Sequence, residues 1–355
     1  MPGLFTRALV AVLLTFPCIA AQAEVPEVIE VAPVWAGHPV GFDLLTHKQK
    51  QFVAFYDAQR CMTIASRPLD STTWTFQVLG SQIYNVYDLK SRAWRRLLDR
   101  PLTDGEGEVS AYLHGPVRGP DRYFHLAWVW RDTPDCATNH SPSYARSHDL
   151  RHWERSDGTA INLPITRSTG EVIDPVPADG GIINGNVVIG FDSERRMIVS
   201  YHKFDEAGAT QLYNARLEDG KWVVRQASDW SYRWAFSGGG SIQFEVRVSP
   251  VQLKADGTLT QAFSHAKHGS GVWTLDPQTL KPTATNPPPP SARPASLEQP
   301  ESDFPGIAVK WHTSGRYHLR WETLPSHRDR PRERPWPEAS MLRVYVFASK
   351  TLPVR

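Results

Sequence analysis

The sequence lacks an excess of charge of either sign. Among its 355 residues, Lys and Arg total 39 and Asp and Glu total 37, so the formal net charge is only +2. Such a balance gives no electrostatic footprint for nucleic acid or for an anionic membrane surface. We therefore expect neither partner, and any anionic ligand must be held by a local basic site.

Several signature segments are also missing. No stretch has the pattern of a long amphipathic helix. Gly238–Gly240 lacks the strand-turn-helix setting of a phosphate loop, and the chain has no Gly-x-Ser-x-Gly elbow. These absences exclude a nucleotide-binding loop and a serine hydrolase of the elbow type.

The N-terminus has the pattern of a secretory leader. Arg7 precedes the apolar run Ala8–Ala20, and Ala21–Ala23 supplies a small-residue cleavage site. A membrane anchor is the alternative, but the run is too short to span a bilayer and the chain turns polar directly after it. We predict a signal peptide over 1–23, no membrane span, and a mature protein that is secreted or periplasmic.

Cysteine is scarce. Removal of the leader would also remove Cys18 and leave Cys61 and Cys136, which could form one disulfide in an oxidising compartment. Their separation of 75 residues says nothing about the distance between them. Cys136 also lies four residues before His140, a spacing that suits a metal-ligand pair. Without a second close pair we predict no metal in the site and no cofactor, with a structural metal ion as an alternative.

Aromatic and turn-forming residues are abundant. The chain has 13 Trp, 11 Tyr and 14 Phe together with 29 Pro and 24 Gly, a composition that favours strands joined by turns. Short alternating runs recur, and three of the four clearest end on Asp: Gln51–Asp57, Tyr123–Asp132, Met197–Asp205 and Tyr317–Glu322. The sequence therefore predicts an all-β fold.

A second pattern repeats after these runs. A small residue and an Arg lead to an Asp turn and then to a Trp in Ala65–Trp74, Ala145–Trp153 and Ala215–Trp222. We interpret each copy as a hairpin whose Asp holds the turn, within the repeated four-stranded sheets of a β-propeller. Subtracting the 23-residue leader leaves 332 residues, which is about 47 per blade for seven blades. We predict a seven-bladed, single-domain propeller over 24–355.

Two end segments and two unusual loops complete this interpretation. We expect Val40–Tyr56 and Met341–Phe347 to pair in one blade and close the ring, because pairing removes an open sheet edge. The Pro-rich stretch 281–300 cannot form a central strand, since proline has no N–H to donate, so we expect a surface loop between late blades. The basic run His327–Arg334 contains two acidic residues, which indicates a solvated loop.

Four groups of residues carry a resemblance to a known family: Trp35–Phe42, Gly119–Asp132, Asn139–Ser147 and Tyr201–Arg216. They resemble the BNR-repeat family of secreted propellers, which includes ulvan lyases, rhamnosyl-glucuronate lyases and a related α-L-rhamnosidase group. The resemblance is strong over Val34–Trp234 and looser elsewhere. It implies a seven-bladed propeller whose lyase members act on uronate polysaccharides.

β-Elimination at a uronate needs a base for the proton at C5, a group that neutralises the carboxylate and an acid for the departing O4. By order and spacing, the resemblance implies catalytic roles for His125, His140, Tyr201 and Arg216. From the chemistry and position of their side chains we also predict substrate-binding roles for Arg131, Asn139, Lys203, Arg233 and Trp234. We therefore predict a polysaccharide lyase that cleaves at C4 of a uronic acid in an acidic glycan containing rhamnose and glucuronate.

Structural roles are alternatives for several of these residues. His125 lies inside an alternating run, where a histidine is often bound to its neighbours in the core. Arg216 shares its Ala-Arg pattern with Arg67 and Arg146, and a residue that recurs between blades can stabilise the blade. Two other functions also stay open: an α-L-rhamnosidase-type hydrolase that uses His38, and a glycan-binding propeller without catalysis.

Overall fold

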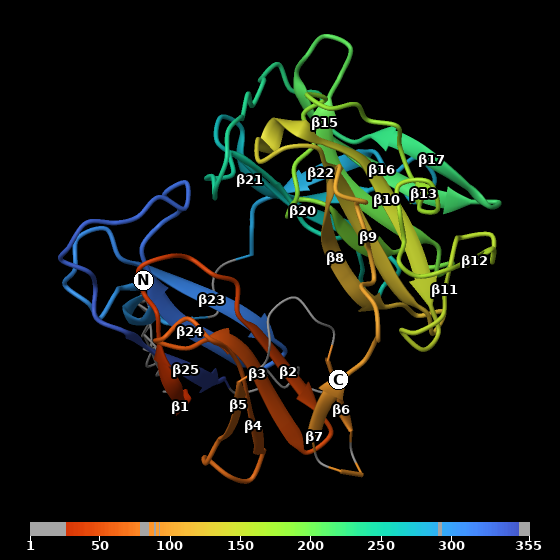
Figure 1. Ribbon diagram of the computed structural model, residues 1–355. Coiled ribbons are helices and arrows are strands. Elements are labelled where there is room, and N and C mark those ends of the chain that lie inside the picture. Colours follow the sequence, from red (N-terminus) through yellow and green to blue (C-terminus); the bar gives the residue numbers. More distant parts are fainter. Residues whose placement is uncertain (1–25, 79–84, 89, 92, 290–292, 348–355) are drawn as a thin grey trace, which may run out of the picture.

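The protein is an all-β propeller of five blades (Figure 1). The computed structural model describes residues 26–347 except 79–84, 89, 92 and 290–292. The signal peptide expected over 1–23 and Cys18 lie outside the described residues. The predicted propeller architecture is confirmed, and the predicted number of seven blades is wrong.

The blades are numbered here in chain order. Blade 1 consists of β2 (Asp43–His47), β3 (Lys50–Tyr56), β4 (Met62–Pro68) and β5 (Thr75–Val78). Blade 2 consists of β8 (Ser110–Arg118), β9 (Phe124–Arg131), β10 (Asn139–Ser147), β11 (Trp153–Glu154), β12 (Ala160–Ile161) and β13 (Glu171–Val172). Blade 3 consists of β14 (Val188–Phe191), β15 (Met197–Phe204), β16 (Thr210–Glu218) and β17 (Lys221–Gln226).

The last two blades follow the same plan. Blade 4 consists of β18 (Val246–Val248), β19 (Gln252–Leu253), β20 (Leu259–His265), β21 (Gly269–Leu275) and β22 (Pro282–Asn286). Blade 5 consists of β23 (Ala308–Ser314), β24 (Tyr317–Thr323), β25 (Ser340–Val346) and β1 (Glu27–Val34). Outside the blades lie a two-stranded sheet of β6 (Asn85–Asp88) and β7 (Ala93–Arg96) and two short 3-10 helices, η1 (Cys136–Thr138) and η2 (Ala295–Glu298).

Long connections between blades explain why the count is five. The link between blades 3 and 4, residues 227–245, contains no strand, and the link between blades 4 and 5 occupies residues 287–307. The prediction of seven blades assumed that these residues form further strands, because it divided the chain length by a usual blade size. The Pro-rich stretch does connect late blades, and its start forms β22, an outermost strand where proline is tolerated.

The ring is closed by a sheet shared between the two ends of the chain. β1 pairs antiparallel with β25, from Glu27 opposite Val346 to Val34 opposite Ser340. The C-terminal strand was therefore predicted correctly, but its N-terminal partner was not. Residues 43–56 instead form β2 and β3 of blade 1, because these strands pair with each other.

The burial of side chains along the strands shows which faces of the blades pack together. In β3 and β4 every second side chain is buried, whereas the central β16 is buried almost throughout because sheets cover both its faces. One apolar cluster joins blades 5 and 1, a second joins blades 2 and 3, and a third joins blades 3 and 4. Figure 1 shows the corresponding grouping of blades 5 and 1 apart from blades 2 to 4.

The two ends of each blade differ. At one end, here called the link end, lie the blade-to-blade links and the turns between second and third strands, such as 132–138 and 205–209. At the other, here called the turn end, lie the turns between first and second strands, such as 119–123 and 192–196. Because the strands are rigid, residues at opposite ends of one strand cannot share a site.

Candidate functional site

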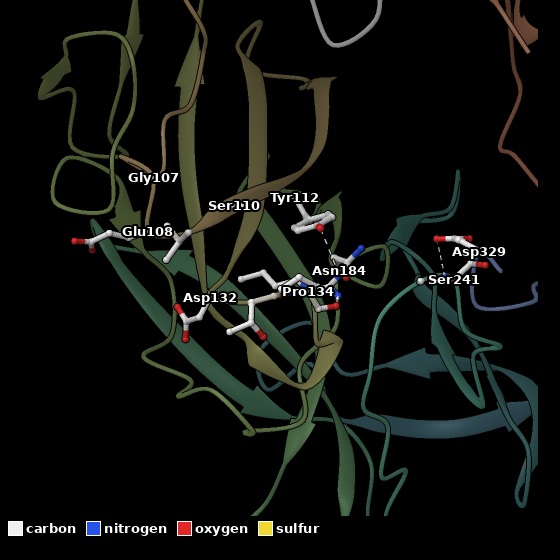
Figure 2. A pocket seen from close by; sticks show the side chains of 13 residues that line it. Gly107, Glu108, Ser110, Tyr112, Asp132, Pro134, Asn184, Ser241 and Asp329 are labelled. Atoms are coloured by element: carbon white, nitrogen blue, oxygen red, sulfur yellow. Dashed lines mark hydrogen bonds between the residues drawn. The ribbon is translucent and has the colours of Figure 1, made fainter. Parts of the chain in front are cut away.

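A cavity of about 640 Å³ opens at the link end, here called the central cavity. Figure 2 shows Tyr112, Asp132 and Asn184 on one side and Ser241 with Asp329 on the other. These side chains come from blade 2, from two blade-to-blade links and from the β24–β25 turn. The cavity therefore gathers residues that are more than 200 positions apart in the sequence.

An aspartate–histidine pair stands at the edge of this cavity. His140 Nε2 lies 2.9 Å from Asp132 Oδ1, and the two side chains are 10% and 39% exposed. The Ser141 hydroxyl lies 3.0 Å from His140 Nδ1. Since a carboxylate only accepts, the proton is expected on Nε2, which leaves Nδ1 to accept from Ser141. Asp132 presents the charged end of the pair to the cavity.

A β-bulge fixes this geometry. The register between β9 and β10 shifts between His140 and Ser143, and Ser141 has a left-handed backbone with a φ of 46°. A bulge re-aims a side chain that regular pleating would direct elsewhere. The backbone N–H of Ser141 donates to the Val176 carbonyl at 2.9 Å, which holds the bulge against the link that follows blade 2.

Arg131 and Tyr112 form the cationic part of the wall. Arg131 Nε donates to the carbonyls of Thr133 and Asp135 at 3.0 and 3.2 Å, and its Nη2 donates to the Pro134 carbonyl. Its Nη1 reaches the Tyr112 hydroxyl at 3.4 Å. Because that hydroxyl accepts from Arg131, its own proton is free to point into the cavity.

A second aspartate–histidine pair closes the opposite wall. His38 Nε2 lies 3.1 Å from Asp329 Oδ1, and the backbone N–H of Ser241 donates to Asp329 Oδ2 at 3.0 Å. The pKa of Asp329 is lowered, mainly by its contact with the side chain of Ser241. Gly240 has a φ of 74° and touches the backbone of Arg328 so closely that no Cβ would fit.

Of the residues expected from the sequence, one lines this cavity and three others contact residues that line it. Arg131 lines it directly, and His140 reaches it through Asp132. Asn139 is buried behind the wall, where its amide donates to Asn184 Oδ1 at 3.3 Å. His38, expected only for the alternative hydrolase, reaches the cavity through Asp329.

His125 lies at the other end of blade 2. It is opposite Arg146 in the β9–β10 register, whereas His140 is opposite Trp130. Five residues of strand place the two histidines roughly 17 Å apart. His125 is buried, with Nδ1 2.9 Å from the Tyr144 hydroxyl and Nε2 3.0 Å from Asp121 Oδ1. Desolvation is the main cause of its lowered pKa.

Arg216 also lies at the turn end. Its guanidinium donates to the carbonyls of Pro277 and Gln278 at 2.5 and 2.7 Å and pairs with Glu218 at 2.7 Å. It thereby fastens blade 3 to the β21–β22 turn of blade 4. Arg67 makes a similar set of bonds to backbone carbonyls in blade 1. This supports the alternative that the recurring arginine stabilises the blades.

Tyr201 and Lys203 share one carboxylate inside blade 3. The Tyr201 hydroxyl donates to Asp174 Oδ2 at 2.6 Å, and Lys203 Nζ lies 2.7 Å from the same oxygen. Tyr201 is fully buried, and this desolvation raises its pKa well above the usual value. The expected convergence of His125, His140, Tyr201 and Arg216 is not observed.

Lys203 and Arg233 line a separate link-end cavity of about 370 Å³. The Arg233 guanidinium lies 3.6 Å from the centroid of the Phe204 ring and donates to the Gly208 carbonyl at 2.8 Å. Trp234, in contrast, is buried and packs on Phe236. It belongs to the apolar core and not to a cavity wall.

Tyr112, Asp132, Ser241 and Asp329 were not singled out in the sequence. A signal existed for Asp132, which ends an alternating run just as Asp57 and Asp205 do. Asp57 accepts the backbone N–H of Cys61 and Asp205 that of Ala209, both at 2.9 Å, so these two hold tight turns. The turn after Asp132 is longer, and its carboxylate binds His140 instead.

Neither of the two cysteines that the structure describes is paired. Cys61 is exposed and Cys136 is buried, and both are free. Burial is the main cause of the raised pKa of the Cys136 thiol. Over the described ranges, no three His, Cys, Asp or Glu side chains gather as a metal site. In the same part of the chain no helix is long and apolar enough to cross a membrane.

Comparisons with known proteins agree with the architecture. A model of the BNR repeat-containing family matches residues 77–230, which contain blades 2 and 3. No curated protein matches the sequence.

Three solved structures are similar to the chain. An ulvan lyase of a new polysaccharide lyase family, bound to -[GlcA(1-4)Rha3S]-, has a TM-score of 0.40 and 9% identity over 86% of this chain and 64% of that one. A xylan β-1,4-xylosidase from Bacillus halodurans C-125 has a TM-score of 0.37 and 11% identity over 91% and 55%. A protein of unknown function from Dyadobacter fermentans DSM 18053 has a TM-score of 0.39 and 10% identity over 91% and 100%. The chain thus spans less than two thirds of the length of the lyase and of the xylosidase.

Proposed function

Proceeding from the family match over residues 77–230, we propose that the protein is an exported polysaccharide lyase that cleaves an acidic glycan at C4 of a uronic acid. The observation that carries the proposal is that Arg131, Tyr112 and Asp132 line one cavity. They supply the three groups that β-elimination requires: a cation for the carboxylate, an acid and a base. The leader pattern over 1–23 supports export.

The roles follow from the hydrogen bonds of each group. Arg131 keeps guanidinium protons free beyond those bound to carbonyls, and these bind the uronate carboxylate. Asp132 takes the proton from C5, and His140 behind it stabilises the new charge distribution. The C4–O4 bond then breaks, a double bond forms between C4 and C5, and Tyr112 gives its hydroxyl proton to O4.

Ultraviolet absorbance of the unsaturated product tests this proposal on uronate polymers that contain rhamnose. Tyr112→Phe removes the acid and is expected to lower the rate about a hundredfold. Tyr123→Phe, at the turn end of the same blade, serves as the control and is expected to keep the full rate. No absorbance rise with the unsubstituted protein on any uronate polymer would rule out the lyase.

A second candidate is glycoside hydrolysis by the two aspartates. The observation that favours it is that Asp132 and Asp329, each paired with a histidine, line opposite walls of the same cavity. Most glycoside hydrolases use two carboxylates that flank the glycosidic bond. Saturated products with a new reducing end would select this function. Binding of the glycan with no product at all would leave a non-catalytic propeller.

A further inference from the structure

A second cavity, of about 500 Å³, lies at the turn end between the first strands of blades 2, 3 and 4 and is here called the turn-end cavity. Along β8 the nearest lining residues of the two cavities, Tyr112 and Val117, are five residues of strand apart, roughly 17 Å. Two arginines, Arg118 and Arg195, line it together with apolar side chains. None of the expected site residues lines this cavity.

Arg118 carries a charge that its own turn does not neutralise. The carboxylate in that turn, Asp121, is bound inward by His125 at 3.0 Å and by the backbone N–H of Tyr123 at 3.1 Å. The Arg118 guanidinium instead lies over the Phe124 ring, 4.6 Å from its centroid. Within the described part of the chain Arg118 forms no ion pair.

Arg195 is in the same situation in the turn of blade 3. Asp192 pairs with Arg196 at 2.8 Å and with Arg216 at 3.4 Å. Glu194 pairs with Arg196 at 3.0 Å. Both acidic residues of this turn are thus occupied, and among the residues that the structure describes Arg195 has no acidic partner. The turn-end cavity therefore combines two uncompensated positive charges.

The walls between these arginines are apolar. Val117, Ile189 and Phe191 line the cavity, and Leu253 at its rim is 44% exposed. A sugar ring has an apolar C–H face that packs on such a surface, while an acidic substituent needs a cation beside it. A cavity with both features suits an acidic saccharide better than a neutral one.

We infer that the turn-end cavity is a second binding site for an acidic glycan, with Arg118 and Arg195 holding carboxylate or sulfate groups. It retains a chain on the face opposite the central cavity and takes no part in bond cleavage. The inference therefore holds or fails independently of the proposed lyase activity.

Calorimetric titration with a galacturonate hexamer tests the site. The double variant Arg118→Gln/Arg195→Gln is expected to lower the binding stoichiometry by one, and each single variant to weaken this site about fivefold. Raising the salt concentration should weaken the same site, because exposed charges are screened. A neutral hexasaccharide of glucose is expected not to bind there.

Arg316→Gln is the matched control. Arg316 also lies at the turn end over an aromatic ring, 5.5 Å from the centroid of Tyr317, but it does not line the turn-end cavity. This variant should bind like the unsubstituted protein. An unchanged stoichiometry in the double variant, or an equal loss in Arg316→Gln, would overturn the inference. If the central cavity binds no uronate, the stoichiometry falls from one to zero instead of from two to one, so the two proposals fail separately.

Discussion

Arg216 and Asp132 lie at opposite ends of neighbouring blades. Their comparison shows the difference between a charged residue that stabilises the blades and one that is available to a ligand. Arg216 is 3% exposed and donates to the backbone carbonyls of Pro277 and Gln278, so its hydrogen-bond partners lie within the protein. Asp132 is 39% exposed, and its carboxylate pairs with the imidazole ring of His140. Arg216 thus fastens the scaffold, whereas Asp132 keeps capacity for a ligand.

The two cavities also differ in charge. Three carboxylates and one arginine line the central cavity, whereas the turn-end cavity has two free arginines and a single aspartate that is already paired. A carboxylate can serve as the base in proton transfer, while retention of an acidic chain needs cations. The difference supports both proposals, cleavage at the link end and retention of an acidic chain at the turn end.

Removing the scaffold clamp should have the largest effect. Arg216→Ala removes a buried guanidinium and leaves the buried carboxylate of Asp192 without one of its partners. We expect it to lower the free energy of unfolding by about 3–5 kcal/mol. Arg225→Ala removes a more exposed partner of Glu218 and should cost less than about 1 kcal/mol. Urea unfolding monitored by Trp fluorescence measures both. A stable Arg216→Ala protein without activity would instead make Arg216 a catalytic residue.

A buried histidine at the link end predicts a pH dependence of stability. Desolvation lowers the pKa of His202 from 6.5 to about 4, so folding favours its neutral form. This stability is present above pH 6.5 and is lost as the pH falls from 6.5 to 4, with a maximum loss of about 3 kcal/mol. His202→Phe should reduce this loss in urea titrations at several pH values.

The exposed His47 provides the control, because His47→Gln should leave the pH dependence unchanged. Burial also lowers the pKa of His265 to about 4, so some pH dependence is expected to remain in His202→Phe. An identical slope in the unsubstituted protein and in His202→Phe would show that His202 does not contribute.

Asp132→Asn should separate the site from the scaffold. The amide is a poor base, so the rate of elimination is expected to fall about a hundredfold, or about 2.7 kcal/mol. The free energy of unfolding should change little, because Asp132 is partly exposed. Asp57→Asn, at the equivalent strand end of blade 1, should keep the rate and lose stability, since Asp57 holds a turn. If Asp132→Asn kept the rate and lost stability instead, Asp132 would have a structural role.

The sequence predicted what depends on local pattern. The alternating runs gave the strands and the propeller, and the repeated Ala-Arg pattern correctly warned of a structural role for Arg216. His140 was singled out through the family resemblance, and Arg131 as an arginine that can bind a carboxylate. Asp329 was interpreted as part of a solvated loop, because its place in the cavity depends on a backbone contact with Ser241, 88 residues away. The blade count depended on links whose lengths carry no periodic signal.

The smallest expected effect belongs to Arg146, which has the same sequence pattern as Arg216 but different partners. Arg146 pairs with one carboxylate, Glu154, at 2.8 Å, and its side chain is 19% exposed. Solvent can replace this partner, so Arg146→Ala should cost about 0.5–1 kcal/mol in urea unfolding. A cost as large as that of Arg216→Ala would mean that the repeated arginine itself, and not the carbonyls that it binds, determines the stability of a blade.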